Sequence, residues 1–118
     1  MRNELITLLE KHCSTVWLEA AEIETCFQGF APNPDDSTLQ KTIFLVHKIK
    51  GSSGALGFPG LSGAAHTLEY ALRDLHAQED NDLALVEIHK LSETLQSEVL
   101  RVTPEQSSLH QSSVMAQT

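Results

Sequence analysis

Apolar residues recur at three- and four-residue steps in four segments of this chain, which is the spacing of amphipathic α-helices. The predicted helices cover residues 3–28, 37–56, 61–75 and 83–102. The apolar stripes are formed by Leu5, Leu9, Val16, Ala20, Ile23 and Phe27; by Leu39, Ile43, Val46 and Ile49; by Leu61, Ala64, Ala65, Leu68, Leu72 and Leu75; and by Leu83, Ile88, Leu91, Leu95, Val99 and Val102. Asp36 or Ser37 is expected to cap the second helix, and Gly57 to end it. Short connections between such helices predict an all-α fold, an antiparallel (up-down-up-down) four-helix bundle.

The chain is long enough, at 118 residues, for one domain with a real core. The bundle is predicted over residues 1–103, and the polar, unpatterned residues 104–118 are predicted to form a flexible, disordered tail. Cys13 and Cys26 fall about 20 Å apart along one predicted helix, which is too far for a disulfide. We expect both to be reduced core residues, and we also expect Trp17 in the core.

Charge and hydropathy narrow the class of protein. The N-terminus lacks a signal-peptide pattern, and no apolar run approaches the roughly 20 residues of a membrane span, so we expect a cytoplasmic protein. The net charge of −8 argues against a nucleic acid or an anionic membrane as partner, because phosphates would be repelled. Residues 37–68 nevertheless carry +3 and the rest of the chain −11. This basic window either meets something anionic or is an accident of composition.

The basic window contains the stretch HKIKGSSGALG, residues 47–57, with three glycines in a predicted helix. Glycine in a helix interior costs about 1 kcal/mol relative to alanine, so its presence asks for a reason. His47 falls at the rim of the apolar stripe, and Gly51 and Gly54 follow it one and two turns later. Because glycine allows close approach, we expect the two glycines to clear a surface beside His47 for another molecule. Phe44 lies on the same side, away from the stripe, and is expected to be a partly exposed docking residue.

The third predicted helix places a carboxylate opposite His47. In an antiparallel hairpin that folds about Phe58, His47 faces Glu69 and Lys50 faces His66. A carboxylate that accepts one imidazole N–H leaves the other nitrogen as an exposed lone pair, which is a nucleophile. On the residues alone, His47 and Glu69 form either such a site or a surface ion pair.

These residues resemble a known family. The run His47-Lys-Ile-Lys50-Gly51-Ser-Ser, followed by Leu56-Gly57 and then Leu68-Glu69, resembles the signature of histidine-containing phosphotransfer (HPt) domains of two-component phosphorelays. The segment GFPGLSGAAHTLEYALRD is also similar to the phosphotransfer domain of chemotaxis histidine kinases. The resemblance is dense over about 23 residues and fits the four-helix pattern of the bundle.

The resemblance implies a role for each matching residue. His47 accepts the phosphoryl group, Lys50 neutralises it, Gly51 admits the partner and Glu69 orients the ring, while His66 is carried over from the chemotaxis subgroup alone. The implied partners are a response-regulator receiver domain and a sensor or hybrid histidine kinase. The protein is then a phosphorylated relay intermediate and not an autonomous enzyme, and we expect a monomer.

The chemistry of phosphoryl transfer agrees with this resemblance. The transfer needs an aligned nucleophile and positive charge near the phosphoryl oxygens. No carboxylate cluster for Mg²⁺ adjoins His47, and GSSGALG fits neither common nucleotide-loop pattern. We therefore expect no metal and no cofactor in this chain, with Mg²⁺ supplied by the partner receiver. Lys48 points away from His47 on the helical wheel and is expected to act at most in partner docking.

Other interpretations stay open. A metal-binding bundle could use His47, His66 and Glu69, although the order His-x-x-Glu reverses the usual di-metal pattern. A docking adaptor without transfer would keep the docking residues, and a domain excised from a chemotaxis-type kinase would look similar. We expect a stand-alone protein, because the chain starts with Met and ends in a predicted disordered tail. The remaining histidines are isolated and predicted to be ordinary helical or solvated residues; they are His12, His76, His89 and His110.

Overall fold

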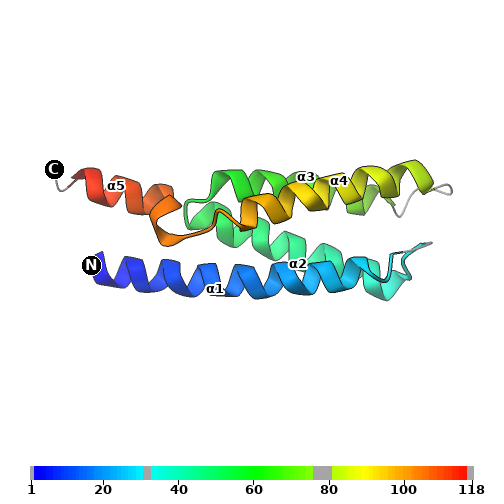
Figure 1. Ribbon diagram of the computed structural model, residues 1–118, viewed down its shortest axis with the longest axis horizontal. Helices are drawn as coiled ribbons and strands as arrows, with labels where there is room; N and C mark the ends of the chain where they lie inside the picture. The colour runs from blue at the N-terminus through cyan, green and yellow to red at the C-terminus, as the bar shows by residue number, and fades with distance from the viewer. Residues whose placement is uncertain (1, 31–32, 76–80, 117–118) are drawn as a thin grey trace.

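The computed structural model describes residues 2–30, 33–75 and 81–116, and in these ranges the chain is helical, without strands. Its elements are α1 (Arg2–Phe27), α2 (Asp36–Ala55), α3 (Pro59–Leu75), α4 (Asp82–Val99), the short 3-10 helix η1 (Pro104–Gln106) and α5 (Ser108–Ala116). Helices α1 to α4 run alternately in opposite directions along one long axis (Figure 1). The molecule measures 56 × 19 × 19 Å. The predicted all-α antiparallel four-helix bundle is thereby confirmed.

The core follows the predicted apolar stripes in each of the four long helices. Fully buried side chains from all four meet along the axis, among them Leu9, Val16, Ile23, Val46, Ile49, Leu68, Leu72, Ile88 and Leu95. The prediction for Leu83 is wrong, because it is 87% exposed and Leu85 takes the buried position on that face. Trp17 is also not a core residue: it is 49% exposed, outside the stripe of α1. Cys13 and Cys26 are free and buried, as expected.

The ends of α2 are fixed by local hydrogen bonds. Asp35, and not the predicted Asp36 or Ser37, caps the N-terminus: its Oδ1 accepts from the backbone N–H of Thr38 at 2.7 Å. That hydrogen bond lowers the pKa of the Asp35 carboxyl. At the other end Gly57 has φ +86°, and the Phe58 N–H donates to the Ser53 carbonyl at 2.8 Å, which is the Schellman pattern. Gly57 thus ends α2 as predicted.

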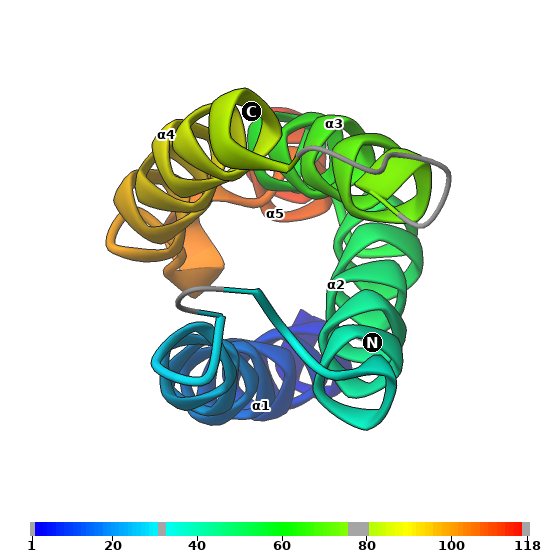
Figure 2. The ribbon, with the colours of Figure 1, turned by 90° about the vertical axis from the view of Figure 1, so that its right-hand side faces the viewer.

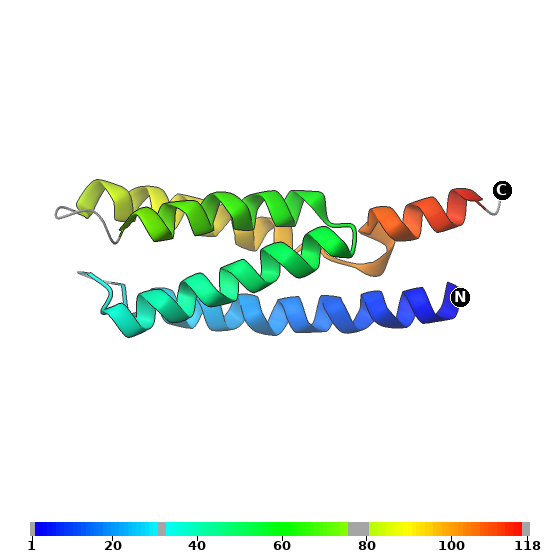
Figure 3. The ribbon, with the colours of Figure 1, turned by 180° about the vertical axis from the view of Figure 1, so that it is seen from behind.

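The prediction that residues 104–118 form a disordered tail is wrong for Pro104–Gln106 and Ser108–Ala116, which form η1 and α5. Ser107 is completely buried, and its hydroxyl donates to the Leu56 carbonyl at 2.6 Å. The Ser108 N–H donates to the Gly57 carbonyl at 2.8 Å, which ties η1 and the start of α5 to the turn between α2 and α3. Polarity misled the prediction because these serines satisfy backbone carbonyls that the turn leaves free. Seen from behind, α5 continues past that turn beside the first part of α1 (Figure 3).

The helices pack most closely as a hairpin of α2 and α3, and of the four neighbouring pairs α1 and α4 pack least closely. Viewed along the axis, the four helices surround the core in sequence, so that α2 lies between α1 and α3 (Figure 2). The Ser62 hydroxyl donates to the Lys50 carbonyl at 2.9 Å and joins α2 to α3 directly. On the opposite side, Gln96 Nε2 donates to the Ala20 carbonyl at 3.1 Å and joins α4 to α1. The close α2–α3 seam carries the residues singled out by the sequence.

Candidate functional site

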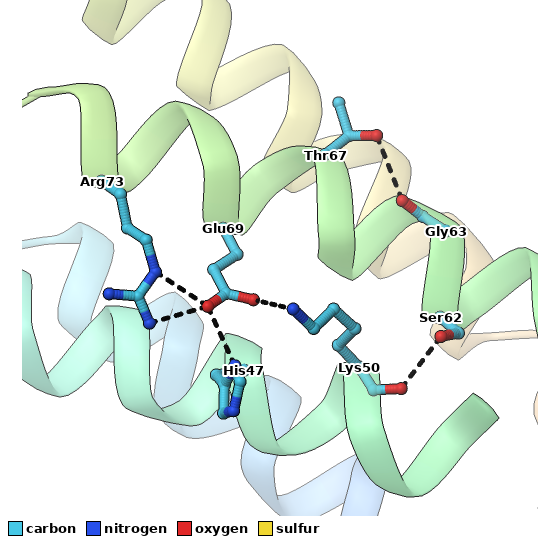
Figure 4. A network of polar contacts seen from close by, with 7 residues as sticks. All are labelled: His47, Lys50, Ser62, Gly63, Thr67, Glu69 and Arg73. Atoms are coloured by element: carbon cyan, nitrogen blue, oxygen red, sulfur yellow. Dashed lines mark hydrogen bonds and ion pairs between the residues drawn. The ribbon is translucent and has the colours of Figure 1, made fainter. Parts of the chain in front are cut away.

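His47 projects from α2 beside α3, with 57% of its side chain exposed (Figure 4). Its chain neighbour Val46 and the residue two positions on, Ile49, are both fully buried, so the backbone beneath His47 is held by the core. A helix with one buried face fixes the direction of the side chains at its rim. The ring is therefore anchored at its base and open to solvent at its edge.

Glu69 of α3 is the hydrogen-bond partner of His47. The distance between His47 Nδ1 and Glu69 Oε2 is 2.9 Å, as the hairpin register predicts. The glutamate is only 5% exposed although it lies next to an exposed histidine. A carboxylate that cannot turn freely into solvent holds the ring in one orientation.

Two cations also contact the Glu69 carboxylate. Lys50 Nζ lies 2.6 Å from Oε1, and Arg73 places Nε at 2.9 Å and Nη2 at 2.8 Å from Oε2. Burial by itself raises the pKa of Glu69, but the contacts with Lys50, Arg73 and His47 outweigh it and lower that pKa to about 2. Glu69 is therefore ionised at neutral pH and can only accept hydrogen bonds.

The charge of Glu69 decides where the ring proton of neutral His47 resides. Because the carboxylate has no hydrogen to donate, Nδ1 must carry the proton and donate it to Oε2. The other ring nitrogen, Nε2, then holds an unshared electron pair. In a histidine with an exposed side chain, that pair is available to an electrophile approaching from solvent.

The remaining predicted site residues lie around this pair in different ways. A cavity of about 150 Å³ is lined by Lys50, His66, Glu69, Tyr70 and Arg73. His66 reaches the rim of this cavity and is exposed, as expected for a residue facing Lys50. In the described part of the chain, no hydrogen bond or ion pair joins His66 to His47 or to Glu69. The structure therefore groups Lys50 with the site more tightly than His66.

The surface beside His47 is open at two of the predicted docking positions. Phe44, one turn before His47, is 63% exposed. A Cβ added at Gly51, one turn after it, would meet nothing within 4 Å. The three positions share one face of α2, so a partner can approach Nε2 over Gly51 while touching an aromatic ring.

Gly54 has a different surrounding from the one expected. A Cβ at this position would lie 3.1 Å from Ser62 Oγ of α3, whose hydroxyl makes the interhelical hydrogen bond to the Lys50 carbonyl. Gly54 therefore allows α2 and α3 to approach each other. The packing against Ser62 is therefore enough to explain why residue 54 is a glycine, and no partner protein is needed to explain it.

Lys48 also makes a contact that the sequence did not reveal. Its Nζ lies 3.1 Å from Oε2 of Glu19 on α1, and the Glu19 side chain is only 8% exposed. Removing Lys48 would leave a buried carboxylate without its counter-charge, which is destabilising. Any docking role of Lys48 is therefore coupled to the stability of the α1–α2 seam.

Arg73 is the residue that the sequence analysis left out of the site. Its position four residues after Glu69 is the spacing of a helical ion pair, and this was the available signal. An i,i+4 pair is so common on helix surfaces that the spacing alone does not mark a site. The structure distinguishes this pair by the burial of its carboxylate.

Comparison with known families decides what kind of domain this is. The family model described as Hpt domain matches residues 4–103 of the chain. The chain belongs to the Hpt domain family. Hpt domains serve histidine phosphotransfer in two-component phosphorelays, where they interact with receiver domains and kinases and are intermediates rather than catalysts. No curated protein and no solved structure matches the chain.

Two searches of the described residues bear on metals and membranes. Among those residues, no group of three or more His, Cys, Asp or Glu side chains is placed so that it could hold a metal ion. None of the helices within the same ranges is long and apolar enough to cross a membrane.

Proposed function

We propose that His47 is the phosphoacceptor of this Hpt domain and that its Nε2 is the attacking atom. The observation that carries the proposal is the 2.9 Å contact between His47 Nδ1 and the ionised, buried Glu69. It keeps the proton on Nδ1 and the electron pair on Nε2, so no general base is needed to activate the nucleophile.

The proposed step exchanges one bond to phosphorus for another. The Nε2 electron pair attacks the phosphorus of an aspartyl phosphate on the partner, an N–P bond forms, the O–P bond breaks and the aspartate leaves as a carboxylate. The proton stays on Nδ1, so the ring becomes cationic as the bond forms. Glu69, in contact with that N–H, stabilises the new positive charge. The reverse step returns the phosphoryl group to a receiver.

We assign Lys50 the neutralisation of the phosphoryl oxygens. Its Nζ now lies 2.6 Å from Glu69, and 27% of its side chain is exposed, which supports a short movement toward an incoming anion. The metal that receiver chemistry requires, Mg²⁺, is assigned to the partner, and this chain is assigned no cofactor. His66 is assigned a secondary place at the rim of the same cavity.

The proposed partner is the receiver domain of a response regulator, with a sensor or hybrid histidine kinase at the other end of the relay. Phe44 and Gly51 support this assignment, because they leave an apolar contact and open space on the His47 face. We place the protein in the cytoplasm as a monomer that meets one receiver at a time.

The test mixes the purified protein with a phosphorylated receiver and follows an acid-labile, base-stable phosphoprotein. Wild type should accept the label, and His47→Gln should accept none while keeping its helical circular dichroism. His89→Gln removes an exposed histidine of α4 and serves as the matched control. Label on the His47→Gln variant would contradict the assignment. A folded wild type that takes no label from any receiver or kinase would favour a docking adaptor.

A further inference from the structure

We infer that Arg73 is a positioning residue that holds Glu69 in place, so that Lys50 can leave the carboxylate for the phosphoryl group on His47. This inference rests on the proposed function and deepens it. It concerns the division of labour between two cations that contact one buried carboxylate (Figure 4).

The two cations contact the carboxylate differently. Arg73 directs both Nε and Nη2 to Oε2, at 2.9 and 2.8 Å, and that oxygen also accepts from His47 Nδ1. Lys50 contacts only the other oxygen, Oε1, through a single atom. Two donors from a planar guanidinium fix the position of an oxygen, whereas one ammonium contact is easily exchanged. The oxygen that orients His47 is therefore the one that Arg73 holds.

The placement on the helices supports the same division. Arg73 and Glu69 are four residues apart on α3, so their contact does not depend on any change in α2. Lys50 lies on α2 with His47, one turn along the same helix. A phosphoryl group on His47 would therefore attract a lysine from its own helix, while the arginine stays with the glutamate.

The burial of Glu69 makes a remaining counter-ion necessary. Its side chain is 6% exposed, and a phosphoryl group would bring about two negative charges to the neighbouring ring. If Lys50 turned to those oxygens and Arg73 were absent, a buried carboxylate would lie beside a dianion with the His47 ring as its remaining counter-charge. Glu69 would then take up a proton or turn away, and His47 would lose its orientation. With Arg73 present, Glu69 keeps its charge throughout the transfer.

A merely structural role for Arg73 predicts something else. A surface i,i+4 ion pair contributes little to helix stability, and its removal would leave the ring of His47 unchanged. Readouts on His47 itself therefore separate the two roles. The variants are Arg73→Ala, which removes the charge, Arg73→Lys, which keeps it, and Arg101→Ala as a control at an exposed arginine in the turn after α4.

The first measurement needs no phosphate. The ¹⁵N shifts of the His47 ring, recorded in neutral imidazole form, report which nitrogen carries the proton. We expect Nδ1–H in wild type, in Arg73→Lys and in Arg101→Ala, and a mixture of both tautomers in Arg73→Ala. The ¹³C titration of the Glu69 carboxyl should move upward in Arg73→Ala alone.

The second measurement loads His47 with phosphoramidate, a small donor that acts without a protein partner. The P–N bond of the donor breaks, ammonia leaves and the N–P bond to Nε2 forms. Arg73→Ala should be loaded about tenfold more slowly than wild type, the size of effect typical for removal of an orienting partner, and Arg73→Lys should recover most of the rate.

The outcomes separate this inference from the proposed function. Unchanged tautomer and unchanged loading in Arg73→Ala would overturn the inference and leave Arg73 as a surface ion pair. Slower loading and a mixed tautomer in Arg73→Ala would support the inference. Failure of every receiver to transfer phosphate to wild type would overturn only the proposed partner, and the inference about Arg73 would still stand. Loading of the His47→Gln variant at the wild-type rate would overturn both.

Discussion

Two histidines on neighbouring helices, His47 of α2 and His12 of α1, have surroundings that differ in nearly every respect. His47 is 57% exposed in its side chain and donates to an ionised carboxylate. His12 of α1 is 6% exposed and stacks on Phe58 with ring centroids 5.4 Å apart and an interplanar angle of 23°. Its Nε2 lies 3.4 Å from the hydroxyl of the buried Ser53. The same side chain is exposed to solvent in one place and packed in the core in the other.

The difference lies in what each ring can do with a proton. Burial lowers the pKa of His12, and Glu19 opposes this only in part, so His12 favours the neutral form. The ring of His47 keeps one edge in solvent and its other nitrogen in contact with a carboxylate that stays charged. Exposure of one nitrogen and control of the other together make a histidine useful for group transfer. A histidine with both ring nitrogens buried is not available for group transfer.

The largest expected effects come from replacing each histidine in turn, because one replacement should remove phosphoryl acceptance and the other should lower stability. His47→Gln should abolish phosphoryl acceptance and change the free energy of unfolding by less than about 0.5 kcal/mol, because an exposed rim residue contributes little to the core. His12→Ala should instead lower that free energy by about 3 kcal/mol through the cavity beside Phe58, and should still accept phosphate when folded. Urea unfolding and single-turnover labelling on both variants check the comparison. An equal loss of unfolding free energy in the two variants would contradict the contrast between an exposed His47 and a buried His12.

Glu69→Gln should produce the next largest effect, and only at His47. The amide can donate to Nδ1, which would move the ring proton to Nε2 and block the attacking electron pair. We expect transfer within the saturated complex to slow by about 100-fold, at the upper end of what orienting partners contribute. Rapid-quench labelling measures the rate. A rate within twofold of wild type would show that the carboxylate does not orient the ring.

Acid should act on the two regions in separate pH ranges. The folded-state pKa of His12 is below 6.5, so the unfolded chain binds the extra proton first and stability falls as the pH drops below about 6.5. The pKa of Glu69 is lowered from 4.5 to about 2, so its contribution is complete above about pH 4.5 and is lost as the pH falls toward 2.

The variant His12→Phe separates the two ranges, because it keeps an aromatic ring on Phe58 and removes the titration. Its free energy of unfolding should stay flatter than that of wild type between pH 7 and pH 5, and should still fall below pH 4.5. Denaturant unfolding at a series of pH values provides the curves. An identical slope for both proteins between pH 7 and pH 5 would show that His12 is not the titrating group.

The smallest expected effect concerns the two glycines after His47. Gly51→Leu meets open space, so we expect weaker receiver binding, by about tenfold, without loss of stability. Gly54→Leu should disturb the contact with Ser62 and lower the melting temperature. Gly63→Leu, at another open helical position on α3, is the matched control. If binding titrations gave wild-type affinity for Gly51→Leu, the receiver would not bind over the open surface at Gly51.

Much of this arrangement is visible in the sequence, because it depends on periodicity and register. The three- and four-residue apolar spacing predicts the four helices, and a hairpin about Phe58 is enough to bring His47 opposite Glu69. A glycine beside a histidine in a helix indicates open space, and at Gly51 that space is present. Each of these features depends on the residue pattern within one helix or on the register between two neighbouring helices.

What the sequence did not show depends on three or more elements together. The sequence predicts only an ordinary helical or solvated residue at His12, whereas the packing of α1 against α2 and Phe58 buries it. Glu19 is likewise buried, in contact with Lys48 of α2. Trp17 is large and apolar and was expected inside, yet its place on the helix turns it outward. Ser107 looked like part of a solvated tail until the carbonyl of Leu56 supplied a partner. Burial of a polar residue depends on such partners, which a one-helix pattern does not contain.

The central claim is that the phosphoryl group is bonded to Nε2 of His47 while Nδ1 keeps its proton for Glu69. Heteronuclear ³¹P and ¹⁵N NMR of the ¹⁵N-histidine-labelled protein, loaded by a phosphorylated receiver, measures both atoms at once. The account predicts phosphorus coupled to Nε2 of His47 and a protonated Nδ1. Phosphorus on Nδ1 of His47, or on any other histidine, would contradict it.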